Sequence, residues 1–308
     1  MSRIVSLISS ATEIVHALGQ LPNQVGRSHE CDFPPEVEAL PVCTRPTIDI
    51  HADSREIDRA VKDRVRNALS VYDVFDDVLE RLQPTHIITQ TQCEVCAVSL
   101  RDVERSVAMR LESRPKIISL TPNSLADVWE DIRRVACALG IAERGEAVVA
   151  SLDARMDEFS EKARSAVRRP RVAAIEWIEP LMVCGNWTPE LIEMAGGINL
   201  FGEAGKHSGY VAWDEIVESD PDVIVIAPCG FDMARTQSEM HWLVKRPEWP
   251  KLRAVRAGRV YVADGNQYFN RPGPRLVETL EILAEILHPE IFEPALEGAG
   301  WKKLIRTA

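Results

Sequence analysis

The stretch RIVSLISSATEIVHALG, residues 3–19, predicts a β-strand that leads directly into an α-helix. The apolar run at 3–7 has the length and composition of a buried strand. Ser10 and Glu13 have capping-box spacing and therefore predict the start of a helix. Gly19 predicts its end, because glycine accepts the left-handed conformation that closes many helices. A strand that leads straight into a helix is a typical unit of an α/β fold.

The same alternation continues through the first half of the chain. HIITQ (86–90) and KIISL (116–120) predict two further strands, with a helix over 98–113 between them. A helical crossover of this kind implies that the strands it joins are parallel. Charged helices are expected over 53–69 and 74–82.

The second half starts with helices and then returns to strands. An amphipathic helix is expected over 124–140, and a proline-free helical pattern over 143–167 would extend about 37 Å at 1.5 Å per residue. Further strands are expected at 171–177, 222–228 and 259–265, and further helices at 188–197, 212–220 and 272–287.

We therefore predict an α/β protein of two Rossmann-like lobes joined by a single long helix. The expected parts are an N-terminal lobe (1–122), a lobe-spanning helical segment (123–169), a C-terminal lobe (170–290) and an irregular tail (291–308).

Composition restricts the function and the location. The 308 residues carry a net charge of −11, and such an acidic chain repels phosphate backbones, so nucleic acid is not expected as a partner. No apolar run is long enough to span a membrane. The first residues show no apolar leader region or cleavage site, which predicts a cytoplasmic protein. A periplasmic location would require that this start be trimmed or misassigned.

Candidate ligand contacts follow the expected strands, because ligands of open α/β sheets bind beyond the carboxyl ends of the strands. Aromatic side chains in these loops suit a large flat ligand. The glycine-rich motifs of nucleotide sites are absent from the sequence. The candidates in the first lobe are His29, Glu30, Cys31, Asp32, Gln92 and Cys93, and those in the second are Trp177, Trp187, Trp213, Cys229, Phe231, Gln267, Tyr268 and Phe269.

The thiols leave several interpretations open. Seven cysteines, an odd number scattered through a large chain, do not form a disulfide framework. Cys93 and Cys96 have the spacing of a redox pair. Together with Cys31 and His29 they could instead hold zinc, another thiophilic ion or an iron–sulfur cluster. Direct contact of a thiol or imidazole with a corrinoid or haem-like ligand, and simple packing in a tight turn, are the other two interpretations.

Longer stretches resemble a known family. RIVSLISSATEIVHALG, VGRSHECDFPPEVEALPVCT and LERLQPTHIITQ are similar to the opening of the class III, helical-backbone substrate-binding proteins of ABC importers for cobalamin and ferric siderophores. SLADVWEDIRRVACALGIAERGEAVVASLDARMDEF resembles their lobe-spanning helical segment. MAGGINLF and VAWDEIVESDPDVIVIAPCG resemble their second-lobe signature. The likeness extends over about residues 3–287, and HECD and CEVCAV are typical of the subgroup labelled cobalamin-binding.

This resemblance implies a binding protein that holds a corrinoid or related metal chelate in a cleft between its lobes. It places Trp213 where the family has a recurring cleft-side tryptophan, and it implies an ABC permease as partner if the protein is exported. Two features depart from the family: the missing export signal, and the HEC and CEVC thiols, which typical cobalamin binders do not need. The alternative is therefore a metal- or cluster-holding protein or enzyme on the same fold. No catalytic residue is assigned, because no nucleophile accompanies Glu176 and Glu179.

Overall fold

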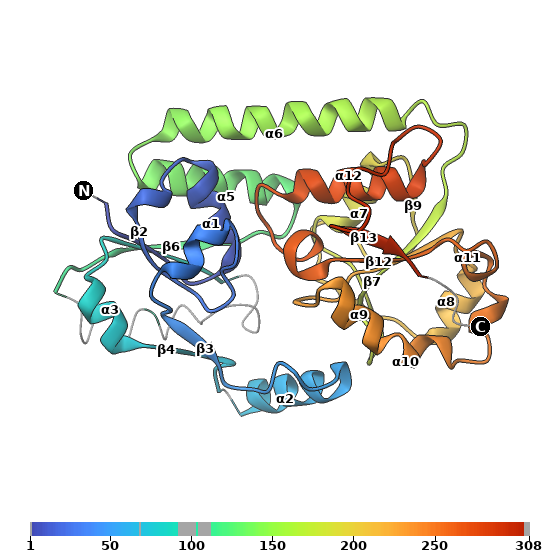
Figure 1. The fold of residues 1–308 in the computed structure, drawn as a ribbon, viewed down its shortest axis with the longest axis horizontal. Coiled ribbons are helices and arrows are strands. Elements are labelled where there is room, and N and C mark those ends of the chain that lie inside the picture. Colours follow the sequence, from blue (N-terminus) through green and yellow to red (C-terminus); the bar gives the residue numbers. More distant parts are fainter. Residues whose placement is uncertain (1, 68, 92–102, 104–111, 305–308) are drawn as a thin grey trace. The chain divides into compact units, whose positions relative to one another are not determined.

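The computed structural model describes residues 2–67, 69–91, 103 and 112–304 (Figure 1). The chain divides into two compact units. Unit 1 comprises Met1–Pro122 and Ala126–Ser151, and unit 2 comprises Asn123–Leu125 and Leu152–Ala308. The domain bounds expected from the sequence remain a prediction.

Unit 1 is built on a four-stranded parallel sheet in the order β2-β1-β5-β6. Its central strands are apolar and buried because the sheet is covered by other elements on both faces. The predicted strands over HIITQ and KIISL are confirmed residue for residue. The strands are β1 (Ile4–Ser6), β2 (Gln24–Arg27), β5 (His86–Gln90) and β6 (Lys116–Leu120).

An antiparallel ribbon, β3 (Thr44–Pro46) with β4 (Tyr72–Val74), extends unit 1 and was not predicted. Its two strands are short and far apart in the sequence, so no local pattern announces their pairing. The helical elements of unit 1 are α1 (Ser9–Ala17), η1 (Leu21–Asn23), η2 (Pro35–Ala39), α2 (Ser54–Arg66), α3 (Asp76–Leu82), α5 (Leu125–Ala138) and the first part of α6 (Ala142–Ala163).

Helix α1 begins differently from the prediction. Its N-cap is Ile8, which forms no side-chain capping bond, so the predicted Ser10–Glu13 capping box is wrong. Ser10 already lies inside the helix, where its hydroxyl is buried. Gly19 follows the helix with φ of 69°, as its role as a stop requires.

Helix α6 is the long helix expected from the proline-free pattern, although it ends at Ala163, before the predicted bound. Its 22 residues correspond to about 33 Å. Residues up to Ser151 belong to unit 1 and those from Leu152 to unit 2. One continuous helix therefore contributes to both units, and the predicted fold class of two α/β halves joined by a long helix is confirmed.

Unit 2 contains a larger sheet in the order β10-β8-β7-β11-β12-β13, with β9 paired to β7. Strands β7, β11 and β12 form its parallel, buried centre, and β8, β10 and β13 are antiparallel additions. The strands are β7 (Arg171–Trp177), β8 (Met182–Val183), β9 (Ile198–Asn199), β10 (Gly209–Tyr210), β11 (Val223–Ile226), β12 (Val260–Ala263) and β13 (Trp301–Lys303).

The expectation of an irregular C-terminal tail is wrong, because β13 pairs with β12. Trp301 holds it there: its ring packs edge-on against Tyr261 and its indole N–H donates to Glu285 Oε2 at 2.6 Å. The helical elements of unit 2 are the rest of α6, α7 (Thr188–Met194), α8 (Trp213–Ser219), α9 (Met233–Glu239), α10 (His241–Val244), η3 (Trp249–Lys251), α11 (Arg253–Arg256), η4 (Gly265–Phe269) and α12 (Leu276–Leu287).

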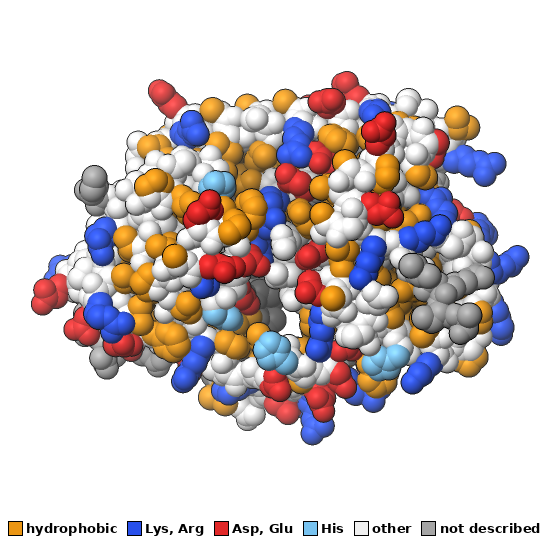
Figure 2. All heavy atoms as spheres, viewed as in Figure 1, with side chains coloured by type: hydrophobic (Ala, Val, Ile, Leu, Met, Phe, Trp, Pro, Cys, Tyr) orange, Lys and Arg blue, Asp and Glu red, His pale blue; other side chains and the backbone are white. Residues whose placement is uncertain are grey.

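Helix α12 is buried along its length except at Glu278, which explains its strongly apolar sequence. Arg155 of α6 forms ion pairs with Glu278 and Glu281 of α12, at 3.0 and 2.6 Å. Charged side chains of both signs are interspersed over the face shown in Figure 2. Within the described ranges, no helix combines the length and the apolar character needed to cross a membrane.

Candidate functional site

The carboxyl ends of β7, β11 and β12 meet at one edge of the unit 2 sheet, because these three strands are parallel neighbours. Trp177 ends β7 and Phe231 follows β11. Their ring centroids are 5.1 Å apart with planes at 51°. The guanidinium of Arg235 lies over the Phe231 ring at 4.9 Å. Two predicted contact residues thus form one aromatic cluster.

The loop after β12 is bonded to the loop after β11. The backbone N–H groups of Gly265 and Asn266 both donate to the Phe231 carbonyl, at 3.0 and 3.1 Å. The Asp264 carboxylate accepts from the Gln267 N–H at 2.8 Å and caps η4. Burial raises the pKa of Asp264. These bonds join the first residues of η4 to the backbone of Phe231.

Guanidinium groups orient the polar side chains of this loop. Arg275 donates to Gln267 Oε1 at 3.1 Å and lies 5.1 Å from the centre of the Tyr268 ring. Arg271, which is buried, donates to Asn266 Oδ1 at 3.2 Å. Both amides and the phenol ring remain partly exposed. The arrangement offers flat apolar surface next to amide groups that can bond a polar ligand periphery.

Two further predicted contacts lie in the interior of unit 2, as does the Phe231 ring, which is 5% exposed. Phe269 is fully buried and Trp187 is 4% exposed. The Trp187 indole N–H donates to the Phe269 carbonyl at 2.9 Å. In the structure they therefore support the loops from behind.

Two cysteines of unit 2, Cys184 and Cys229, lie near Glu176 at the end of β7. Glu176 Oε2 accepts from the Ser208 hydroxyl at 2.5 Å, and Ser208 Oγ accepts from the Gly185 N–H at 2.9 Å. Burial, followed by the charges of Glu176 and Cys229, raises the pKa of Cys184 well above its usual range. Cys184 is therefore a neutral thiol, whereas Cys229 is exposed.

Trp213 belongs to a separate polar and aromatic group at the start of α8. Its indole N–H donates to Glu248 Oε2 at 3.1 Å, and its ring stacks on Trp249 at 6.3 Å. Arg246 lies over the same ring and donates to Glu179 Oε2 at 3.3 Å. Trp213 is thus tied into its own unit on several sides while staying partly exposed.

In unit 1, the loop after β2 carries His29. Its backbone N–H and its Nδ1 both contact Thr44 Oγ1, at 3.1 and 2.8 Å. The ring lies 5.4 Å from that of Tyr72. Burial, and secondly the positive charge of Arg27, lower the pKa of His29 from 6.5 to about 4. The imidazole is therefore neutral at physiological pH.

The neighbours of His29 differ in exposure. Glu30 Oε1 accepts from the Tyr72 hydroxyl at 3.2 Å and stays partly exposed, as does Asp32. Cys31 is 1% exposed, and its sulfur accepts from the Thr12 hydroxyl at 3.0 Å. The structure thus brings His29 and Glu30 together near the surface and places Cys31 under α1.

Three predicted residues, Gln92, Cys93 and Cys96, lie outside the described residues, as does most of the helix predicted over 98–113. In the part of the chain that the structure covers, no group of three or more His, Cys, Asp or Glu side chains is arranged to hold a metal ion. The cysteine-ligated alternative therefore gains no support.

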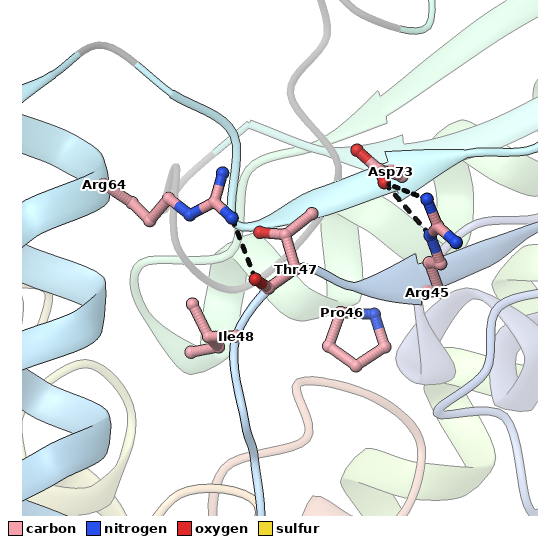
Figure 3. Close-up of a pocket in the computed structure, with 6 residues that line it drawn as sticks. All are labelled: Arg45, Pro46, Thr47, Ile48, Arg64 and Asp73. Atoms are coloured by element: carbon pink, nitrogen blue, oxygen red, sulfur yellow. Dashed lines mark hydrogen bonds and ion pairs between the residues drawn. The ribbon is translucent and has the colours of Figure 1, made fainter.

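A cavity of about 460 Å³ in unit 1 is lined by Arg45, Pro46, Thr47, Ile48, Arg64 and Asp73 (Figure 3). Its two guanidinium groups already have protein acceptors: Arg45 donates to Asp73 and Arg64 to the Thr47 carbonyl. It contains none of the predicted site residues. We therefore assign it no ligand.

The positions of Arg275, Arg235 and Thr44 in these clusters were missed from the sequence. Arg275 stands in the stretch NQYFNRPGPR, directly beyond the candidate amides, so its nearness was available as a signal. Thr44 had no such signal, because it reaches His29 from a strand fifteen positions away.

Two units, each built on a sheet with parallel central strands and both containing part of one long helix, are the architecture of a two-unit binding protein. Comparison with protein families matches residues 4–266 to the periplasmic binding protein family. The chain belongs to that family, which confirms the resemblance stated from the sequence.

Individual relatives agree with this assignment. The uncharacterized ABC transporter substrate-binding lipoprotein YvrC of Bacillus subtilis (strain 168) is 24% identical over 296 residues, 94% of this chain and 81% of YvrC. The apo periplasmic heme-binding protein RhuT from Roseiflexus sp. RS-1 matches with a TM-score of 0.69 and 24% identity, over 94% of this chain and 98% of RhuT. The periplasmic vitamin B12 binding protein BtuF of Vibrio cholerae gives 0.63 and 19%, over 94% and 97%.

The predicted cytoplasmic location is wrong. YvrC is a lipoprotein, and RhuT and BtuF are periplasmic, so the relatives lie outside the cytoplasm. The prediction depended on the first residues alone. The strands and helices of the folded part carry no comparable sign of the compartment.

Proposed function

We propose that this protein binds a metal-containing tetrapyrrole, a corrinoid or a related planar chelate, outside the cytoplasm. The observation that carries the proposal is the group at the carboxyl edge of the unit 2 sheet. It comprises the partly exposed rings of Trp177 and Tyr268 and the amide of Gln267, with the buried Phe231 ring packed against Trp177. Rings of this kind contact a flat macrocycle at low entropic cost, and amides bond its polar periphery.

The relatives support the same ligand class. RhuT is described as heme-binding and BtuF as vitamin B12 binding, and both ligands are planar macrocycles around a metal ion. Unit 1 carries a second candidate polar group, His29 with Glu30, in the loop after β2. The partner that receives the ligand would be an ABC permease, because YvrC is described as an ABC transporter substrate-binding lipoprotein.

Titration of the purified protein with hydroxocobalamin and with hemin tests the proposal. We expect a saturable change in the corrin or Soret absorbance at micromolar ligand, accompanied by quenching of tryptophan fluorescence. Trp177→Phe should reduce the quenching, whereas Trp129→Phe, in α5 of unit 1, serves as the matched control. If neither ligand changes either signal at micromolar concentration, the proposal is rejected.

A further inference from the structure

The loop after β12 carries a side-chain amide, that of Gln267, whose orientation is fixed by an arginine. Resting on the proposed function, we infer that Gln267 Nε2 donates a hydrogen bond to a carboxylate on the periphery of the ligand. Unit 2 would then select tetrapyrroles that carry free carboxylates over tetrapyrroles whose carboxyl groups are amidated or esterified. Gln267 would be the residue that sets this preference.

The orientation of the Gln267 amide follows from its partner. A guanidinium carries only hydrogen-bond donors, so the atom that Arg275 Nη1 reaches at 3.1 Å must be the amide oxygen, Oε1. The other end of the amide is then the NH2 group, which can donate but not accept. Within the described part of the chain, no protein acceptor takes a bond from Nε2, and Gln267 is partly exposed. A ligand group that bonds this nitrogen must therefore be an acceptor.

The acceptors next to Gln267 are already used by the protein. Arg271, which is 2% exposed, donates to Asn266 Oδ1 at 3.2 Å, so a guanidinium also takes the oxygen of the preceding amide. The buried Asp264 carboxylate accepts from the backbone N–H of Gln267 at 2.8 Å. The amide groups of an amidated ligand bring N–H donors that need acceptors, whereas a carboxylate brings acceptors only. The loop therefore matches a carboxylate better than an amide.

Arg275 strengthens the donor as well as orienting it. A hydrogen bond to Oε1 polarises the amide, which makes the Nε2–H of Gln267 a stronger donor. The guanidinium also lies 5.1 Å from the centre of the Tyr268 ring, so its positive charge stays at this place. A hydrogen bond to an ionised acceptor is about twice as strong as one between neutral groups.

The backbone of the loop keeps the amide in position before a ligand arrives. Asn270, at the end of η4, donates through Nδ2 to the Ala227 carbonyl at 2.8 Å and to the Gly265 carbonyl at 3.2 Å. These bonds tie the end of η4 to its own start and to the residue that follows β11. A donor that is already ordered loses little entropy on binding.

Two pairs of ligands that differ at their carboxyl groups test the inference. Hemin is compared with hemin dimethyl ester, and diaquocobyrinic acid with diaquocobinamide, so that the pairs separate a porphyrin from a corrin as the source of the carboxylate. Dissociation constants are measured by absorbance titration. For each macrocycle that wild type binds, we expect the acid to bind at least about tenfold more tightly than its ester or amide partner.

Two substitutions of Gln267 separate the donor from a general charge effect. Gln267→Glu keeps an oxygen for Arg275 but replaces the donor by an acceptor, and Gln267→Met removes the donor without adding charge. Both should reduce the preference for the acid at least about threefold, and Gln267→Glu should reduce it further. Affinity for the ester or amide should stay within about threefold of wild type, which also shows that the variants are folded. The control Gln237→Glu adds the same charge at an exposed position of α9 and should leave the preference unchanged.

The outcomes distinguish this inference from the proposed function. If wild type binds a tetrapyrrole but binds acid and partner equally, or if Gln267→Met keeps the wild-type preference, the inference is overturned and the proposed function stands. If wild type binds no tetrapyrrole at all, both are overturned.

Discussion

Acidification should protonate His29 at a pH well below that of an ordinary histidine. Its pKa falls from 6.5 to about 4, chiefly because the ring is buried. A difference of about 2.5 pKa units corresponds to about 3 kcal/mol, at about 1.4 kcal/mol per unit. Folding therefore favours the neutral form of His29 over the protonated form by that amount, relative to the unfolded chain.

The sign of the effect on stability follows from proton uptake. Between pH 6.5 and 4 the unfolded chain binds a proton at this position and the folded chain does not, so folding loses stability as the pH falls. The contribution of about 3 kcal/mol is present above pH 6.5 and disappears progressively toward pH 4. The free energy of unfolding would be measured in urea at both pH values for wild type and for His29→Gln. The difference between the two proteins isolates the contribution of His29 from that of other titrating groups.

NMR spectroscopy of protein labelled at histidine tests this directly. The chemical shift of the ring carbon is recorded as the pH is lowered. We expect the His29 signal to titrate below pH 5, because burial lowers the pKa of its imidazole to about 4. A His29 midpoint between pH 6 and 7, or a pH dependence of unfolding that His29→Gln leaves unchanged, would refute the buried neutral imidazole.

Three other predictions concern stability, ligand affinity and thiol reactivity. Trp301→Ala should lower the free energy of unfolding by about 3–5 kcal/mol, because it removes a buried ring. Trp301→Phe should lower it by about 1.5–3 kcal/mol, because most of the ring is kept and the main loss is the bond to the Glu285 carboxylate. Equal effects of the two variants in urea titrations would contradict this assignment. Gly265→Ala should weaken tetrapyrrole binding in absorbance titrations, because the added Cβ would lie 2.1 Å from the Pro228 carbonyl oxygen. The control Gly209→Ala should leave binding unchanged, because open space surrounds that position. Iodoacetamide should label Cys229 and spare Cys184, because Cys184 is buried and the pKa of its thiol is raised. Peptide mass spectra would show which cysteine is labelled. Rapid labelling of Cys184 would show that this thiol is accessible.

The strands were the part of the fold most readily predicted from sequence. Runs such as HIITQ and RVAAIEW have apolar centres because these parts of their strands are buried on both faces, and they coincide with β5 and β7. The β3–β4 ribbon and β13 were missed because each is three residues long and pairs with a distant segment. Their stability comes from tertiary contacts such as those of Trp301, which have no local signature.

The candidate site was predicted in part for a similar reason. The rule that ligand contacts follow the carboxyl ends of strands selected Trp177 and Tyr268, which are partly exposed at one edge of the unit 2 sheet, and Phe231, whose ring is buried against Trp177. The same rule selected Trp187 and Phe269, which are buried, because position after a strand does not reveal which way a side chain points.

Native mass spectrometry tests the central claim most directly. The protein would be incubated with a mixture of hemin, diaquocobinamide and a hexadentate ferric siderophore, then separated from free ligand. The account predicts a complex with one tetrapyrrole per chain and none with the siderophore. A complex with the siderophore alone, or no complex with any of the three, would contradict it.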